Sequence, residues 1–325
     1  MFRRSSLSSL ARQAADLSGV SPAALERALR PLTQAPGGLG LGLQAGGHIL
    51  TGGVGGLDPA APHEIASVTK PFTAAVLGQL AAAGQLDAQA PLADLGGPFA
   101  GLPASVTPYA LATHTAGLPA HPLRAGLTVL LDPYAPYGLS EGAALASARR
   151  WAAAGQAGRF GYSNLGAGVL ALALAAAGGA PFPALLARTV TGPLGLESTG
   201  FPAAPPPRAT NFGTLAGAGG LWATAGDLLR FGGSHLDGQL APAWTLTVTP
   251  RGRPAGTDEI APGWFVTGGV WWHDGVARQS RAGLAFCPGS GRVAALLVGG
   301  PPGRFSRGAV RQALLALLGF PPHSR

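Results

Sequence analysis

The sequence predicts an α+β protein in which both ends of the chain build one antiparallel sheet, with a mostly helical region inserted between them. Strand-like runs with turn residues occur near residues 39–51 and again over residues 264–298. Helical apolar spacing dominates between them and also opens and closes the chain. We therefore expect a sheet domain over residues 1–75 and 190–325, flanked by N- and C-terminal helices, and a helical domain over residues 76–189.

The first elements of the chain alternate between helix and hairpin. Residues 7–32 have apolar side chains at helical spacing, interrupted near residues 19–22, which predicts one or two helices. The runs 39–43 and 48–51 flank Ala45-Gly46-Gly47, a composition typical of a hairpin turn. The chain should therefore begin with helices and continue into two paired strands.

Two internal helices have recognisable ends. The spacing from Ser67 to Leu80 predicts a helix that stops at Gly84, because glycine readily adopts the left-handed conformation after a last turn. Pro71 lies early in this helix, so we expect Ser67 to lie in a tight or irregular first turn. The run Thr224-Ala225-Gly226-Asp227 resembles a capping box and predicts the start of a helix through Phe231.

The C-terminal part of the chain has the pattern of strands followed by one helix. A turn at Pro288-Gly289-Ser290-Gly291 joins the last two of the predicted strands. The strands are expected at Trp264–Val266, Val270–Trp272, Gly283–Cys287 and Val293–Val298, and the final helix at Val310–Leu318.

Composition excludes several classes of protein. The net charge is +8 and the single cysteine is Cys287, so there is no intramolecular disulfide and no multi-cysteine metal site. The arginines are scattered and no aromatic stacking motif accompanies them, so we predict no nucleic-acid partner, with polyanion association as a weaker possibility. No apolar run is long enough for export or for a membrane span, which predicts a cytoplasmic protein.

The most informative residue is Lys70, the only lysine in the chain. It lies three positions after Ser67, and residues at i and i+3 share a helix face, so the amine and the hydroxyl can approach each other. A buried amine can lose its proton and act as a base, whereas a guanidinium cannot. Ser67 is thus a candidate nucleophile, activated by Lys70, with its own N–H as one oxyanion donor.

Two further motifs add polar groups. In Tyr162-Ser163-Asn164, the Tyr162 phenol can relay a proton and the Asn164 amide can orient a substrate carbonyl and the lysine, although the tyrosine could instead only cap a loop. His273-Asp274-Gly275 follows a predicted strand. Gly275 would let substrate approach that strand, and Val276 would offer a second oxyanion N–H, although His273 could instead be an ordinary surface residue.

The order Ser-x-x-Lys, Tyr-x-Asn and His-x-Gly resembles the class C β-lactamase-like family of penicillin-recognising serine hydrolases, which includes D-alanyl-D-alanine carboxypeptidases, D-amino-acid peptidases and esterases. Ile65–Ala74, Leu111–Pro119 and Ala218–Thr224 also look like segments of that family. The resemblance implies a β-lactamase/transpeptidase-like fold with the site in a groove between the domains. It implies Ser67, Lys70 and Tyr162 as catalytic residues, and no metal or organic cofactor.

Departures from the family pattern bear on the substrate. His273 stands where the hydrolytic β-lactamases often have lysine, and Asp274 adds a carboxylate, which disfavours a carboxylate-bearing lactam. Residues Pro119 to Ser140, with Tyr134 and Tyr137, are candidates to line the groove. We predict a hydrolase for small esters, amides or lactams. The alternative is a sensor that binds penicillin or peptidoglycan fragments with slow or no turnover, and the sequence does not indicate the oligomeric state.

Overall fold

The computed structural model describes residues 6–122, 139–154, 157–204, 206, 209–210, 212–301 and 308–320. Within them, an antiparallel seven-stranded sheet has the strand order β2-β1-β9-β8-β7-β6-β5. The N-terminal hairpin pairs with β9, so both ends of the chain build one sheet, as predicted. The strands are β1 (Leu39–Ala45), β2 (His48–Val54), β5 (Glu259–Ala261), β6 (Trp264–Thr267), β7 (Val270–Val276), β8 (Ser280–Cys287) and β9 (Arg292–Gly299).

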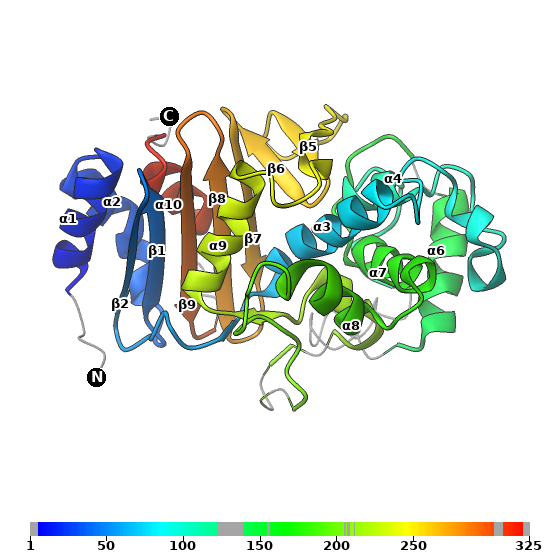
Figure 1. The fold of residues 1–325 in the computed structure, drawn as a ribbon, viewed down its shortest axis with the longest axis horizontal. Helices are drawn as coiled ribbons and strands as arrows, with labels where there is room; N and C mark the ends of the chain where they lie inside the picture. The colour runs from blue at the N-terminus through cyan, green and yellow to red at the C-terminus, as the bar shows by residue number, and fades with distance from the viewer. Residues whose placement is uncertain are drawn as a thin grey trace.

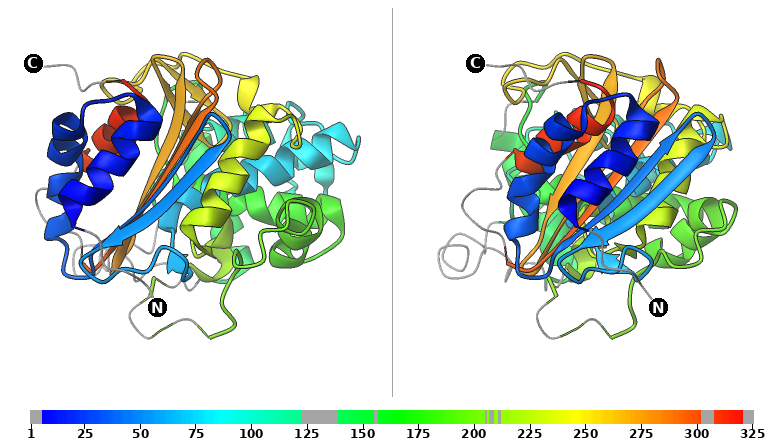
Figure 2. Two further views of the ribbon diagram at one scale, coloured as in Figure 1. Left: turned by 60° about the vertical axis from the view of Figure 1, so that its left-hand side comes forward. Right: turned by 90° about the vertical axis from the view of Figure 1, so that its left-hand side faces the viewer.

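Helices cover both faces of this sheet (Figures 1 and 2). One face packs against α1 (Leu7–Ser18), α2 (Pro22–Leu29) and α10 (Ala309–Leu317). The other face packs against α9 (Ala225–Leu236), and its apolar core continues into the helical region, which contains α3 (Thr69–Ala82), α4 (Pro108–Ala112), α6 (Glu141–Ala154), α7 (Asn164–Gly178) and α8 (Phe182–Leu186). The α+β class is confirmed, while the division into domains at residues 75 and 190 stays a prediction.

Short elements connect these layers. The strands β3 and β4 form a two-stranded ladder in which Glu64 pairs with Trp222. Because β3 ends at Glu64, this ladder comes shortly before α3 begins. These elements are β3 (His63–Glu64), β4 (Trp222–Ala223), the 3-10 helices η1 (Arg30–Gln34), η2 (Ala66–Val68), η3 (Leu92–Leu95), η4 (Gly97–Phe99), η7 (Gly213–Ala218) and η8 (Ala243–Thr245), and the π-helix η6 (Ala187–Thr191).

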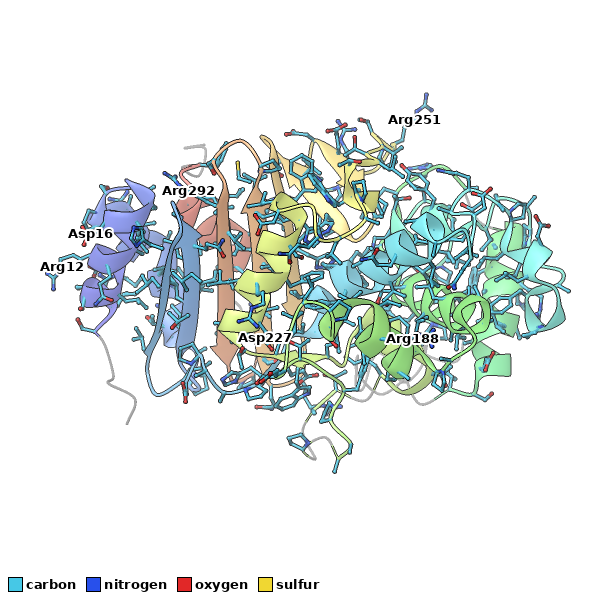
Figure 3. The ribbon with its side chains drawn as sticks, in the orientation of Figure 1. Arg12, Asp16, Arg188, Asp227, Arg251 and Arg292 are labelled. Carbon is cyan, nitrogen blue, oxygen red and sulfur yellow. The ribbon has the colours of Figure 1, made fainter. Side chains whose placement is uncertain are left out.

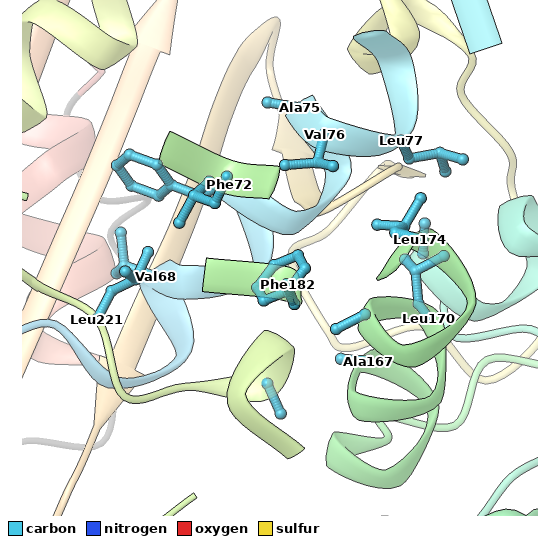
Figure 4. Packing of buried hydrophobic residues seen from close by; sticks show 14 of the residues in the cluster. Val68, Phe72, Ala75, Val76, Leu77, Ala167, Leu170, Leu174, Phe182 and Leu221 are labelled. Carbon is cyan, nitrogen blue, oxygen red and sulfur yellow. The ribbon is translucent and has the colours of Figure 1, made fainter. Parts of the chain in front are cut away.

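Helix α3 is the central element of the molecule. Its apolar side chains point in several directions, towards α7, α8 and the sheet (Figure 4). Phe72 stacks on Phe231 of α9 with ring centroids 3.7 Å apart. A helix that is apolar on all sides is typically buried, and truncation of Phe72 to alanine would cost about 3–5 kcal/mol of stability. This packing fixes the N-terminal end of α3, which carries Lys70 and directly follows the turn that carries Ser67.

Most predicted elements are confirmed, with three corrections. Helix α9 begins after the Thr224 cap, whose Oγ1 accepts the Asp227 N–H at 3.0 Å, but it continues past Phe231 to Leu236. The Asp227 carboxylate accepts hydrogen bonds from the N–H of Ser198 and the hydroxyl of Thr199 and does not cap its own helix. Strand β7 continues to Val276, so the His-x-Gly motif lies inside the strand and not after it.

The surface charges and the helix lengths agree with the composition. Of the charged residues labelled in Figure 3, Arg12 and Asp16 lie on α1 and the others lie on different segments, with no continuous stripe among them. Within the described residues, no single helix is long and apolar enough to cross a membrane. The segments Asn164–Gly178 and Phe182–Thr191 pass that test only as a pair, which is bent by 73°. Cys287 is buried in β8.

Candidate active site

Ser67 lies in an irregular turn between β3 and α3. The turn is η2, and Ala66 before the serine has a φ of 48°, a left-handed conformation that is uncommon for a residue with a side chain. The Thr69 hydroxyl donates to the Ala66 carbonyl at 2.7 Å and fixes this conformation. Pro71 is the third residue of α3, where no intrahelical acceptor exists for a backbone N–H. The predicted irregular first turn is confirmed.

Lys70 is 3% exposed and its amine faces three oxygen atoms. Nζ lies 3.0 Å from Ser67 Oγ, 2.8 Å from Asn164 Oδ1 and 2.8 Å from the carbonyl oxygen of Ala218. Burial lowers the pKa of Lys70 well below its usual value of 10.5, and the charge of Asp274 opposes this shift only in part. A neutral amine has two N–H groups, which the amide and carbonyl oxygens of Asn164 and Ala218 can accept. Its lone pair is then directed at the Ser67 hydroxyl.

The Ala218 carbonyl is held in place by contacts with α3 and α7. The Thr73 hydroxyl donates to the carbonyl of Gly217 at 2.8 Å, and the Leu221 N–H donates to Thr69 Oγ1 at 3.3 Å. A side chain on Gly217 would lie 2.4 Å from Ala171 Cβ, so only glycine allows this close approach. The segment Ala218–Thr224 resembles the family in sequence, but nothing in that resemblance predicts that the Ala218 carbonyl is a partner of the lysine.

The Tyr-x-Asn motif forms the N-terminal end of α7. Ser163 is the N-cap, since its Oγ accepts the Gly166 N–H at 2.8 Å and donates to the Pro119 carbonyl at 2.6 Å. This cap places Asn164 on the first helical turn, facing Lys70, and puts Tyr162 just before the helix. Lys70 Nζ lies 4.8 Å from the centroid of the Tyr162 ring. The structure therefore brings Ser67, Lys70, Tyr162 and Asn164 together.

His114 holds the Tyr162 segment from both sides. Its carbonyl accepts the Gly161 N–H at 2.9 Å, and its Nδ1 accepts the Ser163 N–H at 3.2 Å. Nδ1 is therefore unprotonated and Nε2 carries the hydrogen. The ring centroids of His114 and Tyr162 are 4.5 Å apart. Burial lowers the pKa of His114 well below 6.5, and repulsion by the protonated forms of Lys70 and His273 adds to this shift. The sequence shows only a histidine between two threonines, so it did not predict this role of His114. In the structure His114 also has a φ of 59°, a left-handed conformation.

Strand β7 approaches the nucleophile turn at Gly275. A side-chain carbon there would lie 2.4 Å from the Ile65 carbonyl oxygen and 3.0 Å from the Ser67 nitrogen. At the end of the strand, the Ala277 N–H donates to the Ser280 carbonyl. Because hydrogen-bonded pairs alternate along an antiparallel ladder, the Val276 N–H points away from β8, towards the edge that faces Ser67.

His273 and Asp274 point to opposite faces of β7. The Nδ1 of His273 lies 2.7 Å from the Asp274 carbonyl oxygen, which can only accept, so Nδ1 carries the hydrogen. Nε2 is then an acceptor, and it is buried without a hydrogen-bond partner among the described residues. Burial lowers the pKa of His273 to about 3. His273 is thus a buried neutral residue and not a surface one.

The Asp274 carboxylate does not line the groove as the sequence suggested. It shares the α10 face of the sheet with Arg281, which lies on the paired strand, and with Arg311 of α10. Burial raises the pKa of Asp274, and the positive charges of both arginines oppose that shift. The carboxylate therefore belongs to a charged cluster behind the strand. Residues 123–138, with Tyr134 and Tyr137, lie outside the described residues, and among the described ones no three His, Cys, Asp or Glu side chains are grouped to hold a metal ion.

Comparison with protein families decides the assignment, because the Beta-lactamase family model matches residues 25–318. The chain belongs to the beta-lactamase family. This membership confirms the family and the serine-hydrolase class predicted from the three motifs. A comparison with curated proteins finds no match.

Solved structures show the same fold as this member of the beta-lactamase family. A beta-lactamase/D-alanine carboxypeptidase from Yersinia pestis has a TM-score of 0.73 and 20% identity, over 96% of this chain and all (100%) of that one. An octameric penicillin-binding protein homologue from Pyrococcus abyssi has a TM-score of 0.74 and 19% identity, over 92% and 76%. A D-stereospecific amidohydrolase from Streptomyces sp. has a TM-score of 0.69 and 21% identity, over 85% and 94%.

Proposed function

We propose that the protein hydrolyses an ester or small amide through an acyl intermediate on Ser67. The observation that carries this proposal is the position of the Lys70 amine, 3.0 Å from the Ser67 hydroxyl and buried among acceptors. A neutral amine in that position takes the hydroxyl proton as Oγ attacks the substrate carbonyl carbon. A lysine exposed to water would be protonated at neutral pH and could not act as a base.

Two backbone donors support the oxyanion that forms during the attack. The Ser67 N–H is near the start of its turn and has no intrahelical acceptor, and the Val276 N–H points to the same edge of β7. Loss of one such donor in a serine hydrolase costs about 10²–10³ in kcat. Gly275 allows the two donors to lie on either side of one carbonyl oxygen.

Tyr162 completes the proton path in this proposal. The proton taken by Lys70 passes through the phenol to the leaving oxygen or nitrogen as the bond to the carbonyl carbon breaks, which leaves the acyl group on Ser67 Oγ. Water then attacks the acyl carbonyl, the acid leaves, and Ser67 regains its proton. Asn164 holds Lys70 through its Oδ1 and offers its NH₂ group to the substrate. His273 is proposed to contact the substrate or Tyr162.

Hydrolysis of p-nitrophenyl butyrate by Ser67→Ala tests the proposal. We expect turnover to fall by about 10³-fold or more, to the background of the ester in buffer. A matched Ser234→Ala variant, which changes a buried serine on α9 away from Lys70, should retain activity. Undiminished hydrolysis by Ser67→Ala would overturn the assignment.

The sensor alternative is separated by the lifetime of the acyl enzyme. Intact-mass spectrometry after exposure to a fluorescent penicillin should show an adduct that clears or does not form, as expected for a hydrolase. An adduct that persists for hours would favour a penicillin-binding sensor instead. The cytoplasmic location suggested by the sequence stays a prediction.

A further inference from the structure

A buried carboxyl group, that of Glu64, lies three residues before the nucleophile and has no role in the proposed chemistry. Glu64 is on β3 and is 4% exposed. Its Oε1 accepts the N–H of Thr210 at 3.1 Å, from a segment that is distant in the sequence. A buried carboxyl group costs free energy unless donors face it, so its partners identify what it holds in place.

The groups that face Glu64 come from two other segments. The N–H and the hydroxyl of Thr210 face the carboxyl, and so does the hydroxyl of Ser280, which has no hydrogen-bond partner among the described residues. Burial raises the pKa of Glu64, and these groups oppose that shift. Thr210 Oγ1 accepts the Arg278 N–H at 3.2 Å, so its own hydrogen can point to the carboxyl. Glu64, Thr210 and Arg278 thus form a chain of hydrogen bonds.

Arg278 belongs to the turn that follows β7. This turn is closed by the Ala277 N–H, which donates to the Ser280 carbonyl at 2.9 Å. Val276 is the last residue of β7, two positions before Arg278, and its N–H is the second oxyanion donor of the proposed function. The chain of hydrogen bonds therefore links the strand before the nucleophile to the end of the strand that carries the other donor.

Val276 is held on both sides by residues 64–67, the nucleophile segment. On one side, Gly275 packs so closely that a side-chain carbon there would lie 2.4 Å from the Ile65 carbonyl oxygen. On the other side, the chain of hydrogen bonds ties the turn after β7 to Glu64. Both contacts end on neighbouring residues of one short segment, so together they fix the Val276 N–H relative to the Ser67 N–H.

We propose that Glu64 is a positioning residue, which sets the separation of the two oxyanion donors by holding the turn after β7 against the nucleophile segment. The inference rests on the proposed function and adds a residue to it. Glu64 acts through Thr210 and not by contact with the substrate. A displaced donor weakens the interaction with the oxyanion, which exists only in the transition state and the intermediate. Loss of the carboxyl group should therefore lower kcat and leave KM nearly unchanged.

Two substitutions at Glu64 separate its hydrogen bonds from its charge. In Glu64→Gln the side-chain oxygen can still accept the Thr210 N–H, and the new NH₂ group can donate to the hydroxyls of Thr210 and Ser280. We expect kcat for p-nitrophenyl butyrate to fall about 10-fold in Glu64→Ala but less than about 3-fold in Glu64→Gln, with KM within about 2-fold of native in both. An unchanged kcat in Glu64→Ala, an equal loss in Glu64→Gln, or a loss confined to KM would each overturn the proposal.

A substitution at Thr210 tests the chain even where Glu64→Ala does not fold. Thr210→Val removes the link to Arg278 and keeps the backbone N–H that Glu64 accepts, so kcat should again fall about 10-fold. The matched control is Thr247→Val, because the Thr247 hydroxyl donates to the Glu259 carboxylate at 2.7 Å on β5, at the edge of the sheet. This control should keep the native kcat. Equal losses in the two threonine variants would overturn the proposal.

Binding of butyl trifluoromethyl ketone separates this inference from the proposed hydrolysis. Ser67 Oγ adds to the ketone carbon, Lys70 takes the hydroxyl proton, and the two N–H donors bind the oxyanion that results. Fluorine NMR measures this adduct without ester turnover. We expect about 10-fold weaker binding to Thr210→Val than to the native protein, and native affinity in Thr247→Val.

Each result with the ketone bears on one of the two proposals. Weaker binding to Thr210→Val without hydrolysis of p-nitrophenyl butyrate by the native protein would contradict the proposed function and keep the role of Glu64. Equal binding to the native protein and Thr210→Val would overturn the role of Glu64 and leave hydrolysis standing. A native protein that neither forms the adduct nor hydrolyses the ester would overturn both.

Discussion

On the helical side of Ser67, the polar atoms already have their partners. The Lys70 amine contacts three oxygens, and His114 Nδ1 accepts the N–H of Ser163. On the strand side, His273 Nε2 is buried and none of the residues that the structure describes bonds to it, while the Val276 N–H faces away from β8. The fold therefore completes the hydrogen bonds of the basic group, whereas it leaves a buried acceptor on β7 without a partner among the described residues.

Two buried histidines show the same contrast in their hydrogen positions. His114 accepts at Nδ1 from a backbone N–H, so its Nε2 donates, while His273 donates from Nδ1 to a carbonyl, so its Nε2 accepts. Both are neutral near pH 7 because burial lowers their pKa values. The backbone group next to each ring therefore sets what the ring can do, and the histidine itself does not.

The largest expected effect is on the helical side, at Lys70. Lys70→Arg places a permanent cation there and cannot supply a neutral base, so kcat/KM with p-nitrophenyl butyrate should fall by about 10³-fold or more. Circular dichroism and the thermal midpoint would show whether the variant is folded. A folded Lys70→Arg protein with more than about a tenth of native activity would contradict the role of the amine as the base.

The next effect is on the strand side, at Gly275. Gly275→Ala places a carbon 2.4 Å from the Ile65 carbonyl oxygen, and both atoms are on rigid backbone, so β7 must move away from Ser67. We expect kcat to fall by about 10²-fold, as for the loss of an oxyanion donor. Gly289→Ala in the β8–β9 turn is the control, since nothing lies within 4 Å of its added carbon. Comparable losses in both variants would contradict a special role for the approach at Gly275.

His114 should affect catalysis through the position of Tyr162. An asparagine oxygen can replace Nδ1 as the acceptor for the Ser163 N–H, and asparagine tolerates the left-handed backbone, whereas glutamine reaches the position of Nε2. We expect kcat to fall about 10-fold in His114→Ala and His114→Gln, with KM little changed, and His114→Asn to recover most of it. The pH profile of kcat should shift only in the first two variants. Equal rates for asparagine and glutamine would rule out this contact as the cause.

The effect expected at His273 is on stability and not on activity. Its folded pKa of about 3 is below its unfolded value, so its contribution is full above pH 6.5 and is lost as pH falls towards 3. Chemical denaturation should show that the unfolding free energy of the native protein falls with each pH unit as the pH is lowered from 6 to 4. His273→Gln should reduce this slope by about 1.4 kcal/mol per pH unit. An unchanged slope would show that His273 is already protonated in the folded protein.

Much of the fold was predictable from the sequence because helix starts, turns and apolar spacing are local or periodic features. The helix from Ser67, the capped start at Thr224 and the turn at residues 288–291 depend on nearby residues, and the single lysine made the Ser-x-x-Lys spacing informative. The extension of β7 to Val276 was missed because Gly275 is a weak strand former. There its backbone fits against the Ser67 turn.

Other parts of the site depend on contacts between distant segments and have no signature in a single sequence. The Ala218 carbonyl contacts Lys70 across 148 positions, and any residue type supplies such a carbonyl. The tautomers of His114 and His273 depend on which backbone group lies beside each ring. The direction of the Asp274 side chain followed from strand alternation only once the strand was known to include it.

Titration of the lysine side chain tests the central claim most directly, because Lys70 is the only lysine in the chain. Protein prepared with isotopically labelled lysine gives a single side-chain signal, whose chemical shift can be followed by NMR against pH. We predict a midpoint well below 10.5, with kcat/KM rising through the same midpoint as the amine loses its proton. A midpoint near 10.5, with activity already constant at neutral pH, would show that the amine stays charged and is not the base.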